Sequence, residues 1–184
     1  MPNSIGFPEI YLSVILLSAG IIDYKKQKIP NYLTFPTVIT ALIYHFFLNG
    51  MSGVWFSLGG TFTGIALLII PYAMGGMGAG DVKLLGAIGS FVGYISVVYV
   101  FLFTALFGGI YAVLVLVWHE KSLKNFLKKA CHTVLSVVLT KGYKMESVES
   151  DNKSNIKPRL CYGIAIALGG FSYMGLTLYG YKLS

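Results

Sequence analysis

The chain has 184 residues, of which 55% are hydrophobic and only 11% are charged. Because soluble domains carry about 25% charged residues, this composition excludes an ordinary water-soluble domain and indicates an integral membrane protein. The net charge of +7 does not indicate a nucleic-acid partner, because the basic residues flank apolar runs and form no basic stripe with interleaved aromatic residues. We therefore expect one domain over residues 1–184, embedded in the lipid bilayer.

Six apolar runs are predicted to cross the bilayer as helices, which makes the expected fold all-α. They cover residues 7–22, 32–48, 54–73, 82–92, 94–118 and 160–179. The first run has no basic residue before it and the sequence DYKKQK after it, the reverse of a secretory signal. We therefore interpret it as an uncleaved anchor with its N-terminus outside. Pro30 interrupts the chain after this run, and Asn31 is expected to cap the second helix.

The positions of lysine and arginine predict the orientation of the spans. With the N-terminus outside, the loops 24–31, 74–81 and 119–159 share one side of the membrane. Those loops and their immediate flanks hold every Lys and Arg except Lys182. Positively charged loops stay in the cytoplasm, so this side is predicted to be the cytoplasmic face of the inner membrane.

The segment 119–159 differs in composition from the rest of the chain. Apolar residues recur at helical spacing within it, with lysines elsewhere on each turn; they are Leu123, Phe126, Leu127, Ala130 and Val134. This pattern predicts an amphipathic helix on the cytoplasmic membrane surface, between the fifth and sixth spans.

Two acidic residues, Asp23 and Asp81, are predicted to reach the same membrane face. Asp23 ends the first span and Asp81 follows the third, and both spans run from outside to inside. Charged groups at the hydrocarbon edge are costly and tend to be functional. Taken singly, Asp23 could be a boundary charge beside KKQK, and Asp81 could be a helix cap.

A pair of carboxylates at one site predicts peptide hydrolysis by an aspartic dyad. The ionised carboxylate takes a proton from water, and the protonated one polarises the substrate carbonyl. Like charges at close range share one proton, so the pair titrates as a unit. This chemistry needs no metal, and the cysteines and histidines have no metal-binding spacing, so we expect no cofactor.

Four glycines directly precede Asp81, at positions 75, 76, 78 and 80. Without side chains there, an extended substrate strand could lie close to the acid. The alternative interpretation is tight helix packing, which also favours glycine.

Three segments resemble motifs of a known family. GAGD at 78–81 is similar to the GxGD signature of membrane-embedded aspartic proteases, and GAGDVKLL is similar to a stretch of type IV prepilin peptidases. DYKKQKIPNYLT, residues 23–34, resembles that family's first motif, in which an aspartate at a helix end precedes a basic loop and Ile-Pro-Asn. CYGIAIALGG, residues 161–170, resembles its last-helix motif, usually Pro-Tyr-Gly-Pro-Ala, with Cys161 and Ile164 where prolines are common.

The resemblance implies an aspartic endopeptidase that removes the short basic leader of type IV prepilin or pseudopilin precursors at the cytoplasmic face. Asp23 and Asp81 match the family's catalytic aspartates. The matching motifs supply the expected substrate-binding or supporting residues, which are Gly78, Gly80, Lys83, Pro30 and Asn31. Lys83 is expected either to stabilise negative charge at the dyad or to be one more lysine that sets topology.

Many family members also carry a cysteine-rich, zinc-binding N-terminal segment and methylate the new N-terminus. Since this chain begins at its first span and lacks those cysteines, we expect a short form with peptidase activity only.

Other functions are compatible with part of the pattern. A presenilin-like protease shares GxGD, but the chain has Ile-Asp at 22–23 and no Pro-Ala-Leu motif. A small proton-coupled transporter would place an acid within a span, whereas both acids lie at span ends. A non-catalytic membrane assembly factor could keep the motifs without the activity.

Overall fold

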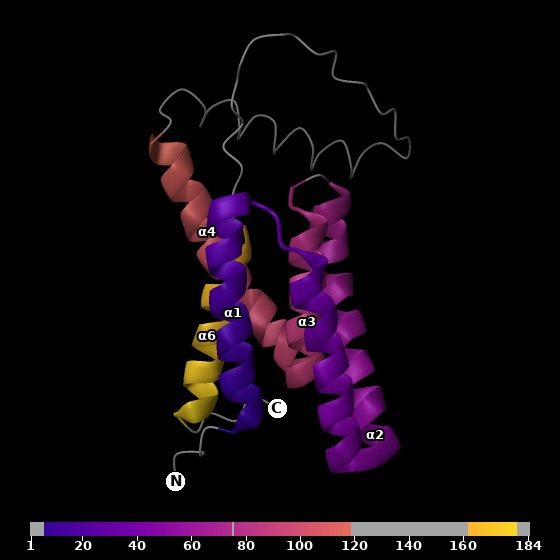
Figure 1. The fold of residues 1–184 in the computed structure, drawn as a ribbon. Helices are drawn as coiled ribbons and strands as arrows, with labels where there is room; N and C mark the ends of the chain where they lie inside the picture. The colour runs from indigo at the N-terminus through magenta and orange to yellow at the C-terminus, as the bar shows by residue number, and fades with distance from the viewer. Residues whose placement is uncertain (1–5, 75, 119–161, 180–184) are drawn as a thin grey trace, which may run out of the picture. The chain divides into compact units, whose positions relative to one another are not determined.

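The computed structural model describes residues 6–74, 76–118 and 162–179, and every regular element in these ranges is an α-helix (Figure 1). The helices are α1 (Phe7–Lys26), α2 (Asn31–Ala73), α3 (Ala79–Val92), α4 (Tyr94–Trp118) and α6 (Tyr162–Leu178). The all-α prediction is therefore confirmed for these ranges. The amphipathic helix predicted within 119–159 lies outside the described residues.

In the part of the chain that the structure describes, three helices are long and apolar enough to cross a membrane: Phe7–Lys26, Asn31–Ala73 and Tyr94–Leu114. The other two, α3 and α6, have 14 and 17 residues, fewer than the roughly 20 that a hydrocarbon core requires. Gly50 has non-helical torsion angles (φ 60°, ψ −139°) and divides α2 into two helical segments, between the predicted spans 32–48 and 54–73. Six crossings and their orientation remain predictions.

The first helix extends a turn beyond the predicted end of its apolar run at Ile22. Its last turn contains Lys25 and Lys26, whose charges interact favourably with the negative end of the helix dipole. Gln27 then adopts the left-handed conformation (φ 48°), and its N–H bonds to the Asp23 carbonyl at 2.8 Å. As a result, Asp23 projects from a helix and not from a loop.

The described residues up to 110, together with 162–179, belong to one compact unit, referred to below as the first unit, and residues 111–118 lie outside it. The pocket described below lies entirely within the first unit. A single peptidase domain over the whole chain remains a prediction.

Small residues bring α2 and α3 into close antiparallel contact. The backbones of Gly60 and Gly89 touch, and Gly64 lies against the backbone of Leu85 and Gly86. A β-carbon on Gly64 would lie 2.6 Å from the Leu85 carbonyl oxygen. Helices in lipid associate largely through such close packing, so these glycines fix where α3 begins.

The same principle joins α1 to α6, which lie side by side in Figure 1. Gly170 packs on Leu16, and Ala167 lies beside Gly20. The positions rise along α1 and fall along α6, so the two helices are antiparallel. This arrangement brings the first turn of α6 to the end of α1, where Asp23 lies.

The distribution of side chains is that of a membrane protein. Small polar side chains such as Thr37, Ser57 and Ser90 are fully buried between helices. Large apolar side chains point outward; Phe47 and Trp55, for example, are 81% and 72% exposed. Such extensive apolar exposure suits a lipid environment and not water.

Replacing Gly60 with alanine is expected to destabilise the protein, because the added methyl group would meet the Gly89 carbonyl and displace α3. Overpacking of this kind costs about 1–3 kcal/mol. The measurement is the thermal unfolding temperature in detergent. Gly59→Ala is the matched control, because nothing lies within 4 Å of its new methyl group. Equal unfolding temperatures for the two variants would contradict the close contact.

Candidate active site

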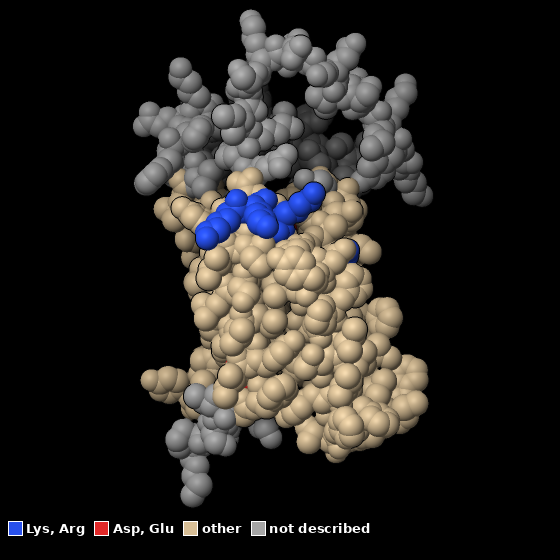
Figure 2. All heavy atoms as spheres, viewed as in Figure 1, with Lys and Arg blue, Asp and Glu red and all other residues tan. Residues whose placement is uncertain are grey.

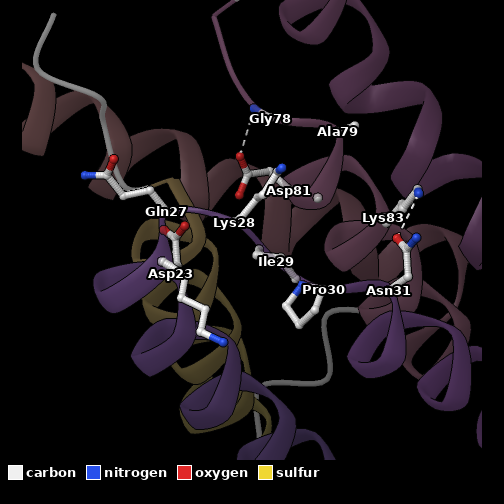
Figure 3. Close-up of a pocket in the computed structure, with 12 residues that line it drawn as sticks. Asp23, Gln27, Lys28, Ile29, Pro30, Asn31, Gly78, Ala79, Asp81 and Lys83 are labelled. Atoms are coloured by element: carbon white, nitrogen blue, oxygen red, sulfur yellow. Dashed lines mark hydrogen bonds between the residues drawn. The ribbon is translucent and has the colours of Figure 1, made fainter.

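A pocket of about 560 Å³ opens where α1 ends and where α2 and α3 begin (Figure 3). All of the site residues predicted from the sequence line it; they are Asp23, Pro30, Asn31, Gly78, Gly80, Asp81 and Lys83. Its remaining walls are formed by Lys26, Gln27, Lys28, Ile29 and Ala79. The structure thus gathers residues from two distant sequence segments, while the role of each residue stays a prediction.

The carboxylate of Asp23 is buried and held by the first turn of α6. The Gly163 backbone N–H donates to Asp23 Oδ2 at 2.9 Å, and the backbone N–H of Ile164 faces the same carboxylate. Asp23 is only 5% exposed. Because a helix N-terminus carries unpaired N–H groups and a partial positive charge, it stabilises a carboxylate there.

Gly163 is the residue that makes this contact possible. A β-carbon at this position would lie 2.8 Å from the Asp23 carboxylate oxygen. Gly163 is not among the site residues predicted from the sequence, although it belongs to the segment CYGIAIALGG that resembles a family motif. That resemblance was the available signal.

The carboxylate of Asp81 is held at the start of its own helix. Asp81 Oδ2 accepts a hydrogen bond from the Gly78 N–H at 3.1 Å, and Asp81 is only 7% exposed. Asp81 lies outside the three helices that are long enough to span a membrane. The pKa of Asp81 is raised to about 6, because burial and, to a smaller extent, the charge of Asp23 outweigh the opposing effect of the Gly78 hydrogen bond.

The helix-cap hypothesis for Asp81 and the dyad hypothesis are therefore compatible. Its carboxylate bonds to the N-cap residue of α3 and also interacts electrostatically with Asp23 across the pocket. Two carboxylates that affect each other's ionisation can share a proton, which is the requirement of an aspartic dyad.

The glycine at position 80 serves packing. A β-carbon on Gly80 would lie 2.9 Å from Ile29 Cβ and 3.0 Å from the Ile29 carbonyl oxygen. This close contact supports the packing interpretation at position 80, while Gly80 also lines the pocket, so the substrate interpretation stays a prediction.

Asn31 does not cap α2 as predicted. The N-cap is Pro30, which makes no side-chain cap bond, and Asn31 is already the first helical residue. The side-chain oxygen of Asn31 instead accepts a hydrogen bond from Lys83 Nζ at 2.9 Å. An ammonium donor forms a stronger hydrogen bond than a neutral N–H, so it takes the oxygen that a cap would have used.

Within residues 6–74, 76–118 and 162–179, His, Cys, Asp and Glu form no group of three or more that could hold a metal ion.

Comparison with known proteins places these residues in a family. Residues 10–113 match the model of the type IV leader peptidase family. The chain is also 34% identical over 111 residues to a prepilin leader peptidase/N-methyltransferase of Vibrio cholerae serotype O1. That alignment covers 55% of this chain and 42% of the relative, so the chain spans less than half of the relative's length. No solved structure matches the chain.

The raised pKa of Asp81 predicts that stability falls with increasing pH. Between the ordinary pKa of 3.8 and the folded value of about 6, the folded protein binds more protons than the unfolded chain. The stability contributed by protonated Asp81 is therefore fully present below the ordinary pKa. It is lost as the pH rises through the pKa of the folded state. The measurement is the unfolding temperature in detergent between about pH 4 and pH 7. Asp81→Asn should show a shallower dependence, and an unchanged slope would contradict the shift.

Proposed function

The chain belongs to the type IV leader peptidase family, and on this basis we propose that it is a membrane aspartic endopeptidase that cleaves the basic leader of type IV prepilin or pseudopilin precursors. The observation that carries the proposal is the pocket in which two buried aspartates from separate helices interact. Family membership favours this hypothesis over the presenilin-like protease, the transporter and the assembly factor.

The geometry suggests how the two acids divide the work. Asp23 accepts hydrogen bonds from backbone N–H groups at the α6 N-terminus, which offset part of the cost of burying its ionised form. Burial favours the protonated form of Asp81. In the proposed reaction, Asp23 takes a proton from water as the water oxygen attacks the scissile carbonyl carbon, and Asp81 donates its proton to the carbonyl oxygen. The intermediate then collapses: Asp23 gives its proton to the amide nitrogen as the C–N bond breaks, and a hydroxyl of the intermediate returns a proton to Asp81.

The lysines support a cytoplasmic location for the pocket. The described lysines lie at the end of the first unit where α1 ends and α3 begins, as Figure 2 shows; they are Lys25, Lys26, Lys28 and Lys83. Since basic residues remain on the cytoplasmic side, we propose that the pocket opens at the cytoplasmic face of the inner membrane. A leader that has not yet crossed the bilayer is accessible there.

The proposal concerns peptidase activity. The N-methyltransferase activity in the name of the Vibrio cholerae protein is not carried over, because the aligned region covers only 42% of that protein.

Asp23→Asn and Asp81→Asn are each expected to abolish cleavage of a prepilin-like precursor in membranes. General acid or base catalysis contributes roughly 10²- to 10⁴-fold, and loss of either acid removes it. The measurement is the rate of leader removal with equal amounts of folded enzyme. Glu9→Gln is the control, because Glu9 lies in the first turn of α1, away from the pocket. Normal cleavage by either aspartate variant would exclude the dyad and favour a non-catalytic role.

Gly163→Ala is expected to lower kcat by about tenfold or more, because its methyl group would displace the Asp23 carboxylate. Gly175→Ala lies on the same helix and meets nothing within 4 Å, so it should retain wild-type kcat. Similar kcat values for the two variants would show that the α6 contact with Asp23 does not matter for turnover.

A further inference from the structure

We propose that Lys83 is a positioning residue that fastens the start of α3 to the start of α2, and thereby fixes the pocket wall that carries Asp81. The inference rests on the proposed peptidase function only for its kinetic consequences. It differs from the two roles expected for Lys83 from the sequence, which are stabilising charge at the dyad and setting topology.

The contacts of the Lys83 side chain point to α2. Its ammonium donates to Asn31 Oδ1 at 2.9 Å, across 52 positions of sequence. The same nitrogen lies 5.6 Å from the centre of the Phe35 ring, within the range of a cation–π interaction. Asn31 and Phe35 are four residues apart on α2, so they present one face of that helix to the lysine.

The ammonium is directed away from the carboxylates. Residues two apart on a helix project to nearly opposite sides, so Lys83 and Asp81 do not face each other along α3. Figure 3 shows the Lys83 side chain beside Asn31 and apart from Asp23 and Asp81. Lys83 therefore acts on the dyad through the position of α3 and not through its charge.

A second contact between the start of α3 and the residues before α2 supports this role. Gly80 packs against Ile29, which is 7% exposed and lies in the linker between α1 and α2. The polar bridge from Lys83 to Asn31 and the apolar contact from Gly80 to Ile29 lie on either side of Asp81 in the sequence. Together they hold the first turn of α3 against the linker that follows Asp23, which sets the relative position of the two acids.

A double-mutant cycle tests the bridge. Lys83→Met and Asn31→Leu should each lower kcat by about tenfold, the effect of losing one hydrogen bond to a charged group, with little change in KM. The double variant should be no slower than either single variant, because both remove the same interaction. A much larger loss for Lys83→Met, with losses that multiply in the double variant, would overturn the proposal in favour of a direct charge effect. Unchanged kcat in both single variants would also overturn it.

Two further variants separate the bridge from charge and from general damage. Lys83→Arg keeps a cationic donor and should retain most of the activity. Lys25→Met removes the same charge from the exposed end of α1, outside the pocket, and should leave kcat unchanged. Loss of activity in Lys25→Met equal to that in Lys83→Met would show that net charge, and not the bridge, controls the rate.

A measurement that needs no catalysis keeps the two proposals distinct. The Asp81 N–H bonds to the Gly78 carbonyl at 3.1 Å in the first turn of α3, so its exchange with deuterium reports how firmly that turn is held. Exchange in the intact protein should be faster in Lys83→Met and in Asn31→Leu than in wild type or Lys25→Met. Equal exchange in all four would overturn the positioning role. If wild type cleaves no precursor, the proposed function fails, and exchange still decides whether the bridge exists.

Discussion

The hydrogen bond from the Gly163 N–H to the Asp23 carboxylate is the contact on which the site depends. A carboxylate at the edge of an apolar medium is costly unless donors reach it, and backbone N–H groups at a helix N-terminus supply them without a second side chain. The contact constrains both helices. It requires α1 to continue past its apolar run so that Asp23 lies on a helical face, and it requires glycine at position 163 so that α6 can approach closely.

Small residues allow the helices to approach as closely as this contact requires. Along α1 and α6, Gly20 and Ala167 allow the helices to approach, and along α2 and α3 the backbones of Gly60 and Gly89 touch. Lipid supplies no hydrophobic force between helices, so packing of this kind decides where they rest. Asp23 lies at the end of α1 and Asp81 lies at the start of α3, and small residues further along these helices set the positions of both. Helix packing therefore determines the shape of the pocket between the aspartates more than the loops beside it do.

The helix class, the approximate helix positions and seven of the twelve residues that line the pocket follow from sequence patterns, because apolar runs, lysine flanks and spaced motifs are local signals. The end of α1 cannot be predicted from hydropathy, because hydropathy falls at Asp23. The helix continues to Lys26 because its last lysines interact favourably with the helix dipole and Gln27 ends it in a left-handed conformation. The capping prediction for Asn31 fails because it considers only neighbouring backbone donors, whereas a lysine 52 positions away takes the oxygen. The contact between Gly163 and Asp23 cannot be predicted from local sequence patterns, because it joins residues that are 140 positions apart.

That separation bears on how the protein is made. During synthesis both aspartates enter the membrane long before α6 has left the ribosome, and Asp23 then lacks the donors that hold it. On the proposed function, a nascent or truncated chain carries the catalytic residues without the arrangement that uses them. On the same proposal, α6 completes the site, so cleavage becomes possible only after this helix has packed against α1.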